Sequence, residues 1–251
     1  MSGLDFLPFV SVDEVSRWNK EWMQYFSSEP AGPHVLPYEY YQSTPALDNV
    51  ANLNAEAVFN LTLAHNTAGE RDYDLHIWVP GRNLLQKAIL EIGCGCGLLG
   101  KELGLIASSY LGLDYSRIAL AIARGVSPAN CRYLHISDRD AIKQSAETMD
   151  VMVGREFFIH QNFANALWVI RLGKFLLRPG GTIHADFYWP DPSVRQGVLH
   201  PCRAGLDPQY PSCAFLYSDE DVKDLARETG VSVESIEIYA PYQRKFVTFK
   251  V

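Results

Sequence analysis

The sequence predicts an α/β fold: an N-terminal helical lid followed by a doubly wound, mostly parallel seven-stranded sheet with a C-terminal antiparallel hairpin. Three observations support this fold class. From Lys87 onward, short apolar segments alternate with helical patterns, which is typical of a parallel sheet covered on both faces. A glycine-rich loop follows the first apolar segment, as at the ligand-binding edge of such sheets. A short turn around Pro241 joins the last two strand-like segments and predicts their antiparallel pairing.

The spacing of apolar residues predicts the individual elements. Strands are expected at Lys87–Ile92, Ser109–Asp114, Arg132–Ile136, Asp150–Val153, Thr182–Phe187, Ser232–Tyr239 and Lys245–Val251. Helices are expected between them at Gly97–Leu105, Ser116–Arg124, Asp140–Glu147 and Asn162–Leu177. Ser218 and Asp221 form a capping pair that predicts one more helix, reaching Glu228.

The chain divides into two expected parts. Residues 1–85 form a helical N-terminal lid or substrate segment, because Ser11 and Glu14 make a capping box ahead of apolar residues at helical spacing. Residues 86–251 form the ligand-binding domain, with a proline-rich insertion at 188–216. Long insertions of this kind in compact domains are usually functional, so the insertion and the lid are expected to surround the ligand.

Composition and charge argue against several classes of protein. The net charge is −7 and no run of Lys or Arg occurs, so a nucleic-acid partner is not expected. No apolar run reaches the roughly 20 residues of a membrane span, and the first residues lack the basic start of a signal peptide. Five cysteines give no disulfide framework, and Cys94 and Cys96 lack zinc-knuckle spacing. A reduced, cytoplasmic protein without a metal is therefore expected, and its oligomeric state is left open.

The segment Ala88–Gly97 carries the strongest chemical signal. It is a strand that runs into a loop containing Gly93, Gly95 and Gly97, and the loop opens a helix. Glycines without a Cβ let a ligand lie against the backbone and permit unusual dihedral angles. The loop is therefore expected to hold a nucleotide or nucleoside at the carboxyl end of the strand.

The register of this loop favours one ligand over another. Gly95, Gly97 and Gly100 also fit the dinucleotide fingerprint, but that register places Gly93 and Glu91 where a buried strand needs apolar side chains. An acid just before the loop suits the ammonium group of a methionine moiety and repels a pyrophosphate. The pattern therefore favours S-adenosylmethionine. An NAD(P)-binding oxidoreductase remains an alternative, although no Tyr-x-x-x-Lys pair of the short-chain type is found.

These residues resemble the class I, Rossmann-like superfamily of S-adenosylmethionine-dependent methyltransferases, of the small-molecule type. The resemblance covers about residues 87–230. Glu91–Gly97 resembles the family's first motif and Tyr110–Ser116 its second, which implies that Asp114 holds the ribose hydroxyls and Tyr115 lies along the adenine. Ser137-Asp138 resembles a third motif, in which the acid meets the adenine amino group. The cofactor-binding residues implied in this way are Glu91, Gly93, Cys94, Gly95, Gly97, Asp114, Tyr115 and Asp138, to which we add Arg155.

Two departures from the family pattern concern the acceptor and the adenine. The segment Gly154–His160 resembles a Glu-x-x-Glu-His stretch, but Ile159 replaces the second Glu. Where the family has the triplet Gly-Asp-Ala, this chain has Ser-Asp-Arg at residues 137–139. The chain also lacks the Asn/Asp-Pro-Pro-aromatic tetrad of enzymes that methylate nucleobase amines. It likewise lacks the paired acids with which catechol-type enzymes bind a metal. A metal-independent, in-line methyl transfer to oxygen, nitrogen or carbon of a small molecule is therefore expected.

His160 is the candidate general base, because a neutral imidazole can accept a proton near neutral pH. Each of these residues also has a structural interpretation. His160 could cap the next helix or fill a gap, Asp114 could cap the helix after its strand, and Asp138 could be a solvated turn residue. Arg155 and Glu156 could orient the substrate or pair with each other. A protein that binds S-adenosylmethionine without transferring its methyl group is the remaining alternative.

Overall fold

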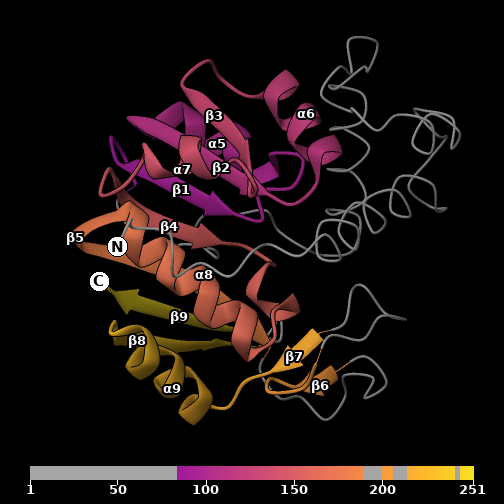
Figure 1. The fold of residues 1–251 in the computed structure, drawn as a ribbon, viewed down its shortest axis with the longest axis vertical. Helices are drawn as coiled ribbons and strands as arrows, with labels where there is room; N and C mark the ends of the chain where they lie inside the picture. The colour runs from indigo at the N-terminus through magenta and orange to yellow at the C-terminus, as the bar shows by residue number, and fades with distance from the viewer. Residues whose placement is uncertain (1–83, 189–198, 206–213, 241–243) are drawn as a thin grey trace, which may run out of the picture.

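The structure is a computed structural model that describes residues 84–188, 199–205, 214–240 and 244–251, drawn in colour in Figure 1. The expected N-terminal lid at 1–85 lies outside these residues except for its last two positions. Much of the expected insertion at 188–216 lies outside them as well, so the division into a lid and a binding domain stays a prediction.

One sheet organises the described residues. Its strands are β1 (Ala88–Ile92), β2 (Ser109–Asp114), β3 (Cys131–His135), β4 (Met149–Gly154), β5 (Leu177–Tyr188), β6 (Leu199–Pro201), β7 (Ala214–Leu216), β8 (Ser232–Tyr239) and β9 (Arg244–Lys250). The strand order is β3-β2-β1-β4-β5-β7-β6, and β9 also pairs with β5 and with β8. Strands β1 to β5 are parallel to one another, whereas β9 is antiparallel to both β5 and β8. The mostly parallel sheet and the final hairpin are thus confirmed.

The sheet differs from the expected one at two places. The insertion contributes two further short strands, so the described sheet has nine strands where seven were expected. Each of these strands has only three residues, too few for an alternation of apolar and polar side chains to be recognised from the sequence. Strand β5 also begins at Leu177, the last residue of the expected helix and five residues before the expected strand, and its pairing with β4 shifts register between Met149 and Val151.

Side chains cap the starts of three of the six helices in the described residues. The six helices are α5 (Leu98–Ile106), α6 (Arg117–Val126), α7 (Arg139–Lys143), the 3-10 helix η1 (Phe158–His160), α8 (Phe163–Leu176) and α9 (Asp219–Thr229). The Ser116 and Asn162 side chains accept bonds from backbone N–H groups of α6 and α8, and Ser218 with Asp221 forms the predicted capping box of α9. Helix α7 is shorter than expected, and beyond it Glu147 has a φ of 50°, which a helix cannot continue through.

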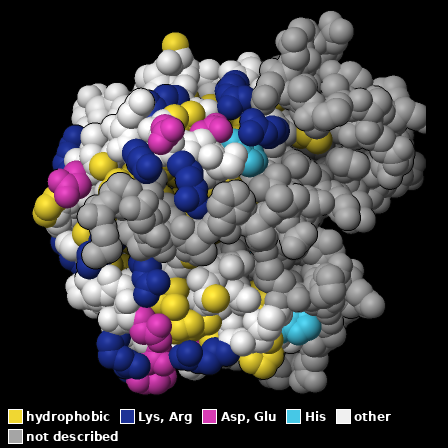
Figure 2. Space-filling view, in the orientation of Figure 1, with side chains coloured by type: hydrophobic (Ala, Val, Ile, Leu, Met, Phe, Trp, Pro, Cys, Tyr) yellow, Lys and Arg dark blue, Asp and Glu magenta, His cyan; other side chains and the backbone are white. Residues whose placement is uncertain are grey.

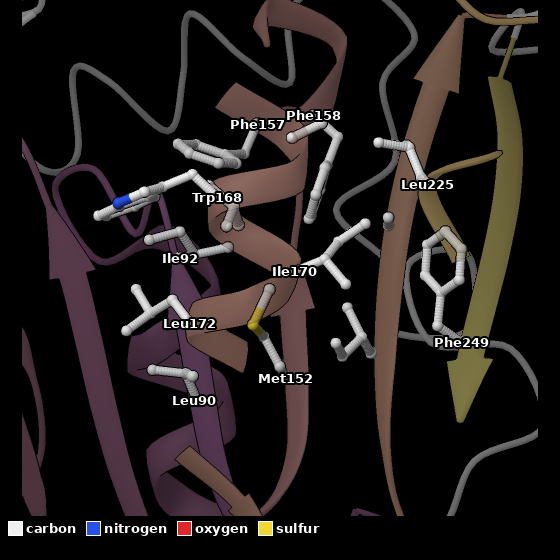
Figure 3. Packing of buried hydrophobic residues seen from close by; sticks show 14 of the residues in the cluster. Leu90, Ile92, Met152, Phe157, Phe158, Trp168, Ile170, Leu172, Leu225 and Phe249 are labelled. Atoms are coloured by element: carbon white, nitrogen blue, oxygen red, sulfur yellow. The ribbon is translucent and has the colours of Figure 1, made fainter. Parts of the chain in front are cut away.

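The two faces of the sheet bury different sets of side chains. Leu90 and Ile92 of β1 belong to a core cluster with residues of α8 and α9, in which Met152, Ile170 and Phe249 also lie (Figure 3). Ile89 belongs to a second cluster with residues of α5 and α6. Because side chains alternate along a strand, Glu91 lies on the same face as Ile89. The carboxyl ends of β1, β2, β4 and β5 lie at one edge of the sheet, since these strands are parallel.

Among the described helices, none has the length and apolar character that a membrane span requires.

Candidate functional site

The glycine loop after β1 adopts a conformation that depends on glycine. Gly93, Gly95 and Gly97 all have positive φ, of 68°, 52° and 84°. A Cβ on Gly93 would lie 2.8 Å from Cγ and 3.0 Å from Cβ of Phe157, which is closer than side chains approach. The N–H groups of Gly93 and Cys94 donate to the Leu113 carbonyl at 2.8 and 3.2 Å, so the loop is fastened to the end of β2. Backbone atoms of this loop therefore form one wall of the site.

Asp114, the last residue of β2, fixes the other side of the loop. Its carboxylate accepts the Gly95 N–H at 2.8 Å through Oδ2 and the Ser116 N–H at 2.7 Å through Oδ1. Burial raises the pKa of Asp114 to about 6, although the backbone N–H donors lower it. The Tyr115 N–H acts on the same carboxylate. Each carboxylate oxygen can accept about two hydrogen bonds, so the group as a whole keeps capacity for a further donor. The side chain that caps α6 is Ser116 rather than Asp114, which leaves Asp114 available for a ligand diol.

Glu91 lies in the interior of β1 with 3% of its surface exposed. The Tyr110 hydroxyl donates a hydrogen bond to Glu91 Oε2. Burial raises the pKa of Glu91 to about 8, while the Tyr110 hydrogen bond and the positive charge of Arg155 lower it. A buried carboxylate with this environment gains stability from a nearby cation. Glu91 is thus suited to a ligand ammonium group at the loop.

The turn after β4 carries the remaining candidate residues. Arg155 is a largely buried side chain whose Nη2 lies 3.7 Å from Glu156 Oε2, so the expected pairing of these two residues exists. His160 is half-buried and ends η1, where its N–H donates to the Phe157 carbonyl at 3.1 Å. Ile159 is 2% exposed, and a charged Glu at this position would be desolvated. This burial explains why Ile replaces the second acid of the family pattern.

Sequence and fold comparisons complete the description of this region. A family model described as a methyltransferase domain matches residues 90–183, from β1 through the glycine loop and Asp114 into β5. Residues 90–183 are thus similar to a methyltransferase domain, and the sheet has the class I, Rossmann-like fold. The sequence resemblance is confirmed at this level.

Relatives of this methyltransferase domain include the mitochondrial ubiquinone biosynthesis O-methyltransferase of Rattus norvegicus. The two are 31% identical over 174 residues, which is 65% of this chain and 50% of the rat protein. This chain therefore spans about half the length of that curated relative. Similar structures include a TehB-like SAM-dependent methyltransferase from Corynebacterium glutamicum, with 16% identity and a TM-score of 0.54 over 80% of this chain and 98% of that one. An S-adenosylmethionine-dependent methyltransferase from Mesorhizobium loti has 17% identity and a TM-score of 0.51 over 68% and 93% of the two chains. These structural likenesses concern the fold.

The two residues that are expected to contact the adenine have different surroundings. Tyr115 is 6% exposed and belongs to the core cluster on the α8 face. Asp138 is half-buried, and its Oδ2 accepts the His135 N–H at 3.1 Å. This bond holds the turn after β3 in place, so Asp138 has a local structural role whether or not it meets a ligand.

Two features of the site have no counterpart among the expected residues. His135 is buried, with Nδ1 2.6 Å from Ser137 Oγ and Nε2 2.8 Å from the Tyr115 carbonyl, so it ties the end of β3 to the end of β2. Asp186 and Arg244 form a buried ion pair near the end of β5, with Arg244 Nε 3.3 Å from Asp186 Oδ2. A charged residue inside an apolar strand was the available sequence signal for Asp186. Its partner could be known only from the pairing of β5 with β9.

Replacing Glu91 with Gln tests how the pKa of this buried carboxyl group affects stability at different pH values. Because the pKa of Glu91 is raised from 4.5 to about 8, the folded chain retains a proton that the unfolded chain has released between these values. The contribution of Glu91 to stability is therefore full below pH 4.5 and is lost as pH rises toward 8. Between pH 6 and 8, wild type should lose stability relative to Glu91→Gln by about 1 kcal/mol per pH unit. Urea unfolding without cofactor measures this, and parallel pH curves for the two proteins would contradict it.

Proposed function

We propose that the chain transfers the methyl group of S-adenosylmethionine to a small-molecule acceptor by in-line displacement, without a metal. The observation that carries the proposal is the geometry of Asp114 in the glycine loop. Both carboxylate oxygens are held by backbone N–H groups at 2.7 and 2.8 Å, and the carboxylate retains capacity for a further donor. This arrangement fits two neighbouring ribose hydroxyls, and Glu91 on the adjacent strand fits the ammonium of the methionine moiety.

We propose that different residues of the chain bind different parts of the cofactor. Backbone atoms of Gly93, Cys94, Gly95 and Gly97 would contact the cofactor, because this loop lies at the carboxyl end of β1 and is held against the end of β2. Arg155 would neutralise the methionine carboxylate, since its positive charge already acts on buried Glu91. We keep Tyr115 and Asp138 as candidate adenine contacts. When bound, S-adenosylmethionine supplies a methyl group that is already activated by its sulfonium, so the protein mainly positions it and the acceptor.

His160 is the proposed general base for an acceptor hydroxyl. It follows β4, whose carboxyl end lies beside that of β1, and it belongs to the turn whose Phe157 lies against Gly93 of the glycine loop. The rat relative is named an O-methyltransferase, which leads us to propose a hydroxyl-bearing acceptor here. A phenolic or alcoholic hydroxyl needs its proton removed during transfer, and a neutral imidazole can take it near neutral pH.

His160→Ala should lower kcat for a hydroxyl acceptor by about a hundred-fold or more, because general-base catalysis contributes that much. The affinity for S-adenosylmethionine should not change. His200→Ala is the matched control, since His200 is also half-buried but lies on β6. Methyl transfer is measured with isotopically labelled cofactor and the best acceptor from a panel of phenols. Full turnover by His160→Ala would remove the general-base assignment and leave the cofactor assignment intact.

Calorimetry with S-adenosylmethionine and with NAD(P)H separates the proposed function from its alternatives. A methyltransferase binds the first ligand and transfers label to an acceptor. Preferential binding of NAD(P)H would overturn the proposal in favour of an oxidoreductase. Binding of S-adenosylmethionine with no labelled product from any acceptor or extract fraction would support a non-methylating binder. A chelator should leave turnover unchanged if no metal takes part.

The surroundings of the protein are also proposals. The described cysteines, Cys94, Cys96, Cys131 and Cys202, are free thiols, which suits a reducing compartment, and we propose the cytoplasm. The rat relative is named mitochondrial, so fractionation of cells that express the tagged chain is the appropriate test. On the face in Figure 2, basic side chains lie among acidic ones, and α9 carries the ion pairs Lys223–Glu220 and Arg227–Asp224. This mixture supports a small-molecule partner rather than a nucleic acid.

A further inference from the structure

A group of four charged side chains, called here the Asp186 cluster, lies where β4 and β5 end and β9 begins. It consists of Arg155, Glu156, Asp186 and Arg244. Arg244 connects the two acids, with Nε 3.3 Å from Asp186 Oδ2 and Nη2 3.7 Å from Glu156 Oε1. Arg155 reaches the other oxygen of Glu156, at 3.7 Å. Asp186 and Arg244 are 1% and 4% exposed, so the pairing takes place away from water.

The fold fixes the carboxylate of Asp186 in one orientation. Antiparallel pairing places Asp186 opposite Phe246 and Tyr188 opposite Arg244, and the Arg244 guanidinium lies 4.4 Å above the centre of the Tyr188 ring. The Glu156 N–H donates to Asp186 Oδ2 at 3.1 Å, from a backbone with a φ of 50°. Oδ2 thus faces both a cation and a backbone donor. The orientation is set by three separate segments of the chain.

The second oxygen of Asp186 is different, because it is buried and has no hydrogen-bond partner. Asp186 lines a small pocket whose volume is about 10 Å³, room for one group the size of a water molecule or a hydroxyl, and the pocket opens toward solvent. The other lining includes the apolar side chains of Val153, Ala185 and Phe246. His184 also lines this pocket, but its ring nitrogens lie 3.1 and 3.2 Å from the hydroxyls of Thr182 and Thr248.

A buried acceptor without a donor is costly, by about 1–3 kcal/mol or more for a charged group. Such an atom is a sign that a ligand supplies the donor. The donor can be an ammonium or a hydroxyl, and the charges of the cluster discriminate between them. The guanidinium groups of Arg155 and Arg244 lie beside both acids, so an ammonium buried among them would be repelled by two positive charges. A neutral hydroxyl is not repelled in this way, and the apolar walls suit the carbon skeleton that carries it.

We propose that Asp186 anchors the acceptor by accepting a hydrogen bond from one of its hydroxyl groups. This inference rests on the proposed function for its account of why a hydroxyl compound enters the site. The pocket includes Val153 and Gly154 at the end of β4, the strand next to β1 and its glycine loop. A hydroxylated ring held there lies at the same edge of the sheet as the cofactor loop.

The test uses phenol and its methyl ether, anisole, as probes, because a methyl group replaces the hydroxyl proton in anisole and removes the hydrogen-bond donor. Ligand-observed NMR titration at pH 8.5 gives both dissociation constants for the full chain. Wild type should bind phenol at least about ten-fold more tightly than anisole, as one hydrogen bond to a charged acceptor implies. Asp186→Ala should abolish this preference. Equal binding of the two probes by wild type, or an unchanged preference in the variant, would overturn the proposal.

Two further variants show whether a lost preference for phenol reflects the lost hydrogen bond or a folding defect. In Asp186→Asn the amide oxygen can accept from Arg244 and Glu156, which turns the amide NH₂ toward the pocket. Phenol and anisole can both accept from NH₂, so the preference should again vanish. Asp150→Asn is the matched control, because Asp150 also accepts a backbone N–H, from Ala88 at 2.8 Å, and an arginine, Arg178 at 2.5 Å, far from the pocket. It should keep the preference of wild type.

Titration of the same samples with S-adenosylmethionine keeps the two proposals apart. If wild type prefers phenol through Asp186 but binds no S-adenosylmethionine, the proposed function fails and the hydroxyl site remains. If S-adenosylmethionine binds and the phenol preference is absent, the cofactor assignment remains and the Asp186 site is rejected.

Discussion

Asp114→Ala is expected to weaken the binding of S-adenosylmethionine by about a hundred-fold or more. Two ribose hydroxyls lose a charged acceptor, and each such hydrogen bond is worth about 1.5–3 kcal/mol. The substitution also leaves the N–H groups of Gly95 and Ser116 without their acceptor, which loosens the loop that the cofactor contacts. Calorimetry with purified protein measures the loss directly.

A control is needed to distinguish lost contacts from a lost fold. Asp150→Ala removes a carboxylate that also binds a backbone N–H and an arginine, but at the opposite end of β4 from the glycine loop. It should bind S-adenosylmethionine like wild type while being destabilised to urea. Binding by Asp114→Ala as tight as that of wild type would refute the cofactor assignment altogether.

Gly93→Ala is expected to destabilise the domain by about 3 kcal/mol, because two costs add. The left-handed conformation costs an L-residue about 1–2 kcal/mol, and overpacking a core costs about 1–3 kcal/mol. Rotation of the Phe157 ring cannot relieve the overlap, since Cβ of Phe157 would itself lie only 3.0 Å from the new methyl group. Phe157 is 4% exposed and packs edge-on against Phe158 at 5.6 Å, so the whole turn after β4 has to shift.

Gly180→Ala is the matched control for Gly93. Gly180 has a φ of 82°, and a Cβ there would meet nothing within 4 Å, so this substitution should cost only the conformational term of about 1 kcal/mol. Urea unfolding midpoints at constant m-value give both numbers. Equal destabilisation by the two substitutions would show that the contact between the loop and Phe157 does not matter.

Much of the fold could be predicted because the signals were local. The strand at Ser109–Asp114 and the strand at Ser232–Tyr239 have the predicted ends. The Ser218 and Asp221 capping box could be recognised from four consecutive residues. The glycine loop was recognisable because strand, glycines and helix follow one another in the chain. Each of these predictions needed information from only a few neighbouring positions.

The candidate site was less predictable, because its contacts join distant segments. The Tyr110 hydroxyl reaches Glu91 across the pairing of β1 and β2, and the alternation of apolar residues does not reveal which polar groups will meet. Asp186 and Arg244 meet only because β9 runs antiparallel to β5. Strands β6 and β7 were missed for a similar reason, since three residues acquire strand geometry from their neighbours in the sheet.

The position of β9 has a consequence for how the molecule is made. Strand β9 lies along β5 from Thr182 to Tyr188, yet β8 and α9 are synthesised between them. Until β9 has left the ribosome, one side of β5 offers unpaired backbone groups and apolar side chains, which is the kind of edge that other chains can pair with. The half of the sheet that carries Asp186 therefore forms late and through contacts between distant residues, which fold slowly. Expression at reduced temperature, or with chaperones that shield such edges, should raise the yield of folded protein for this reason.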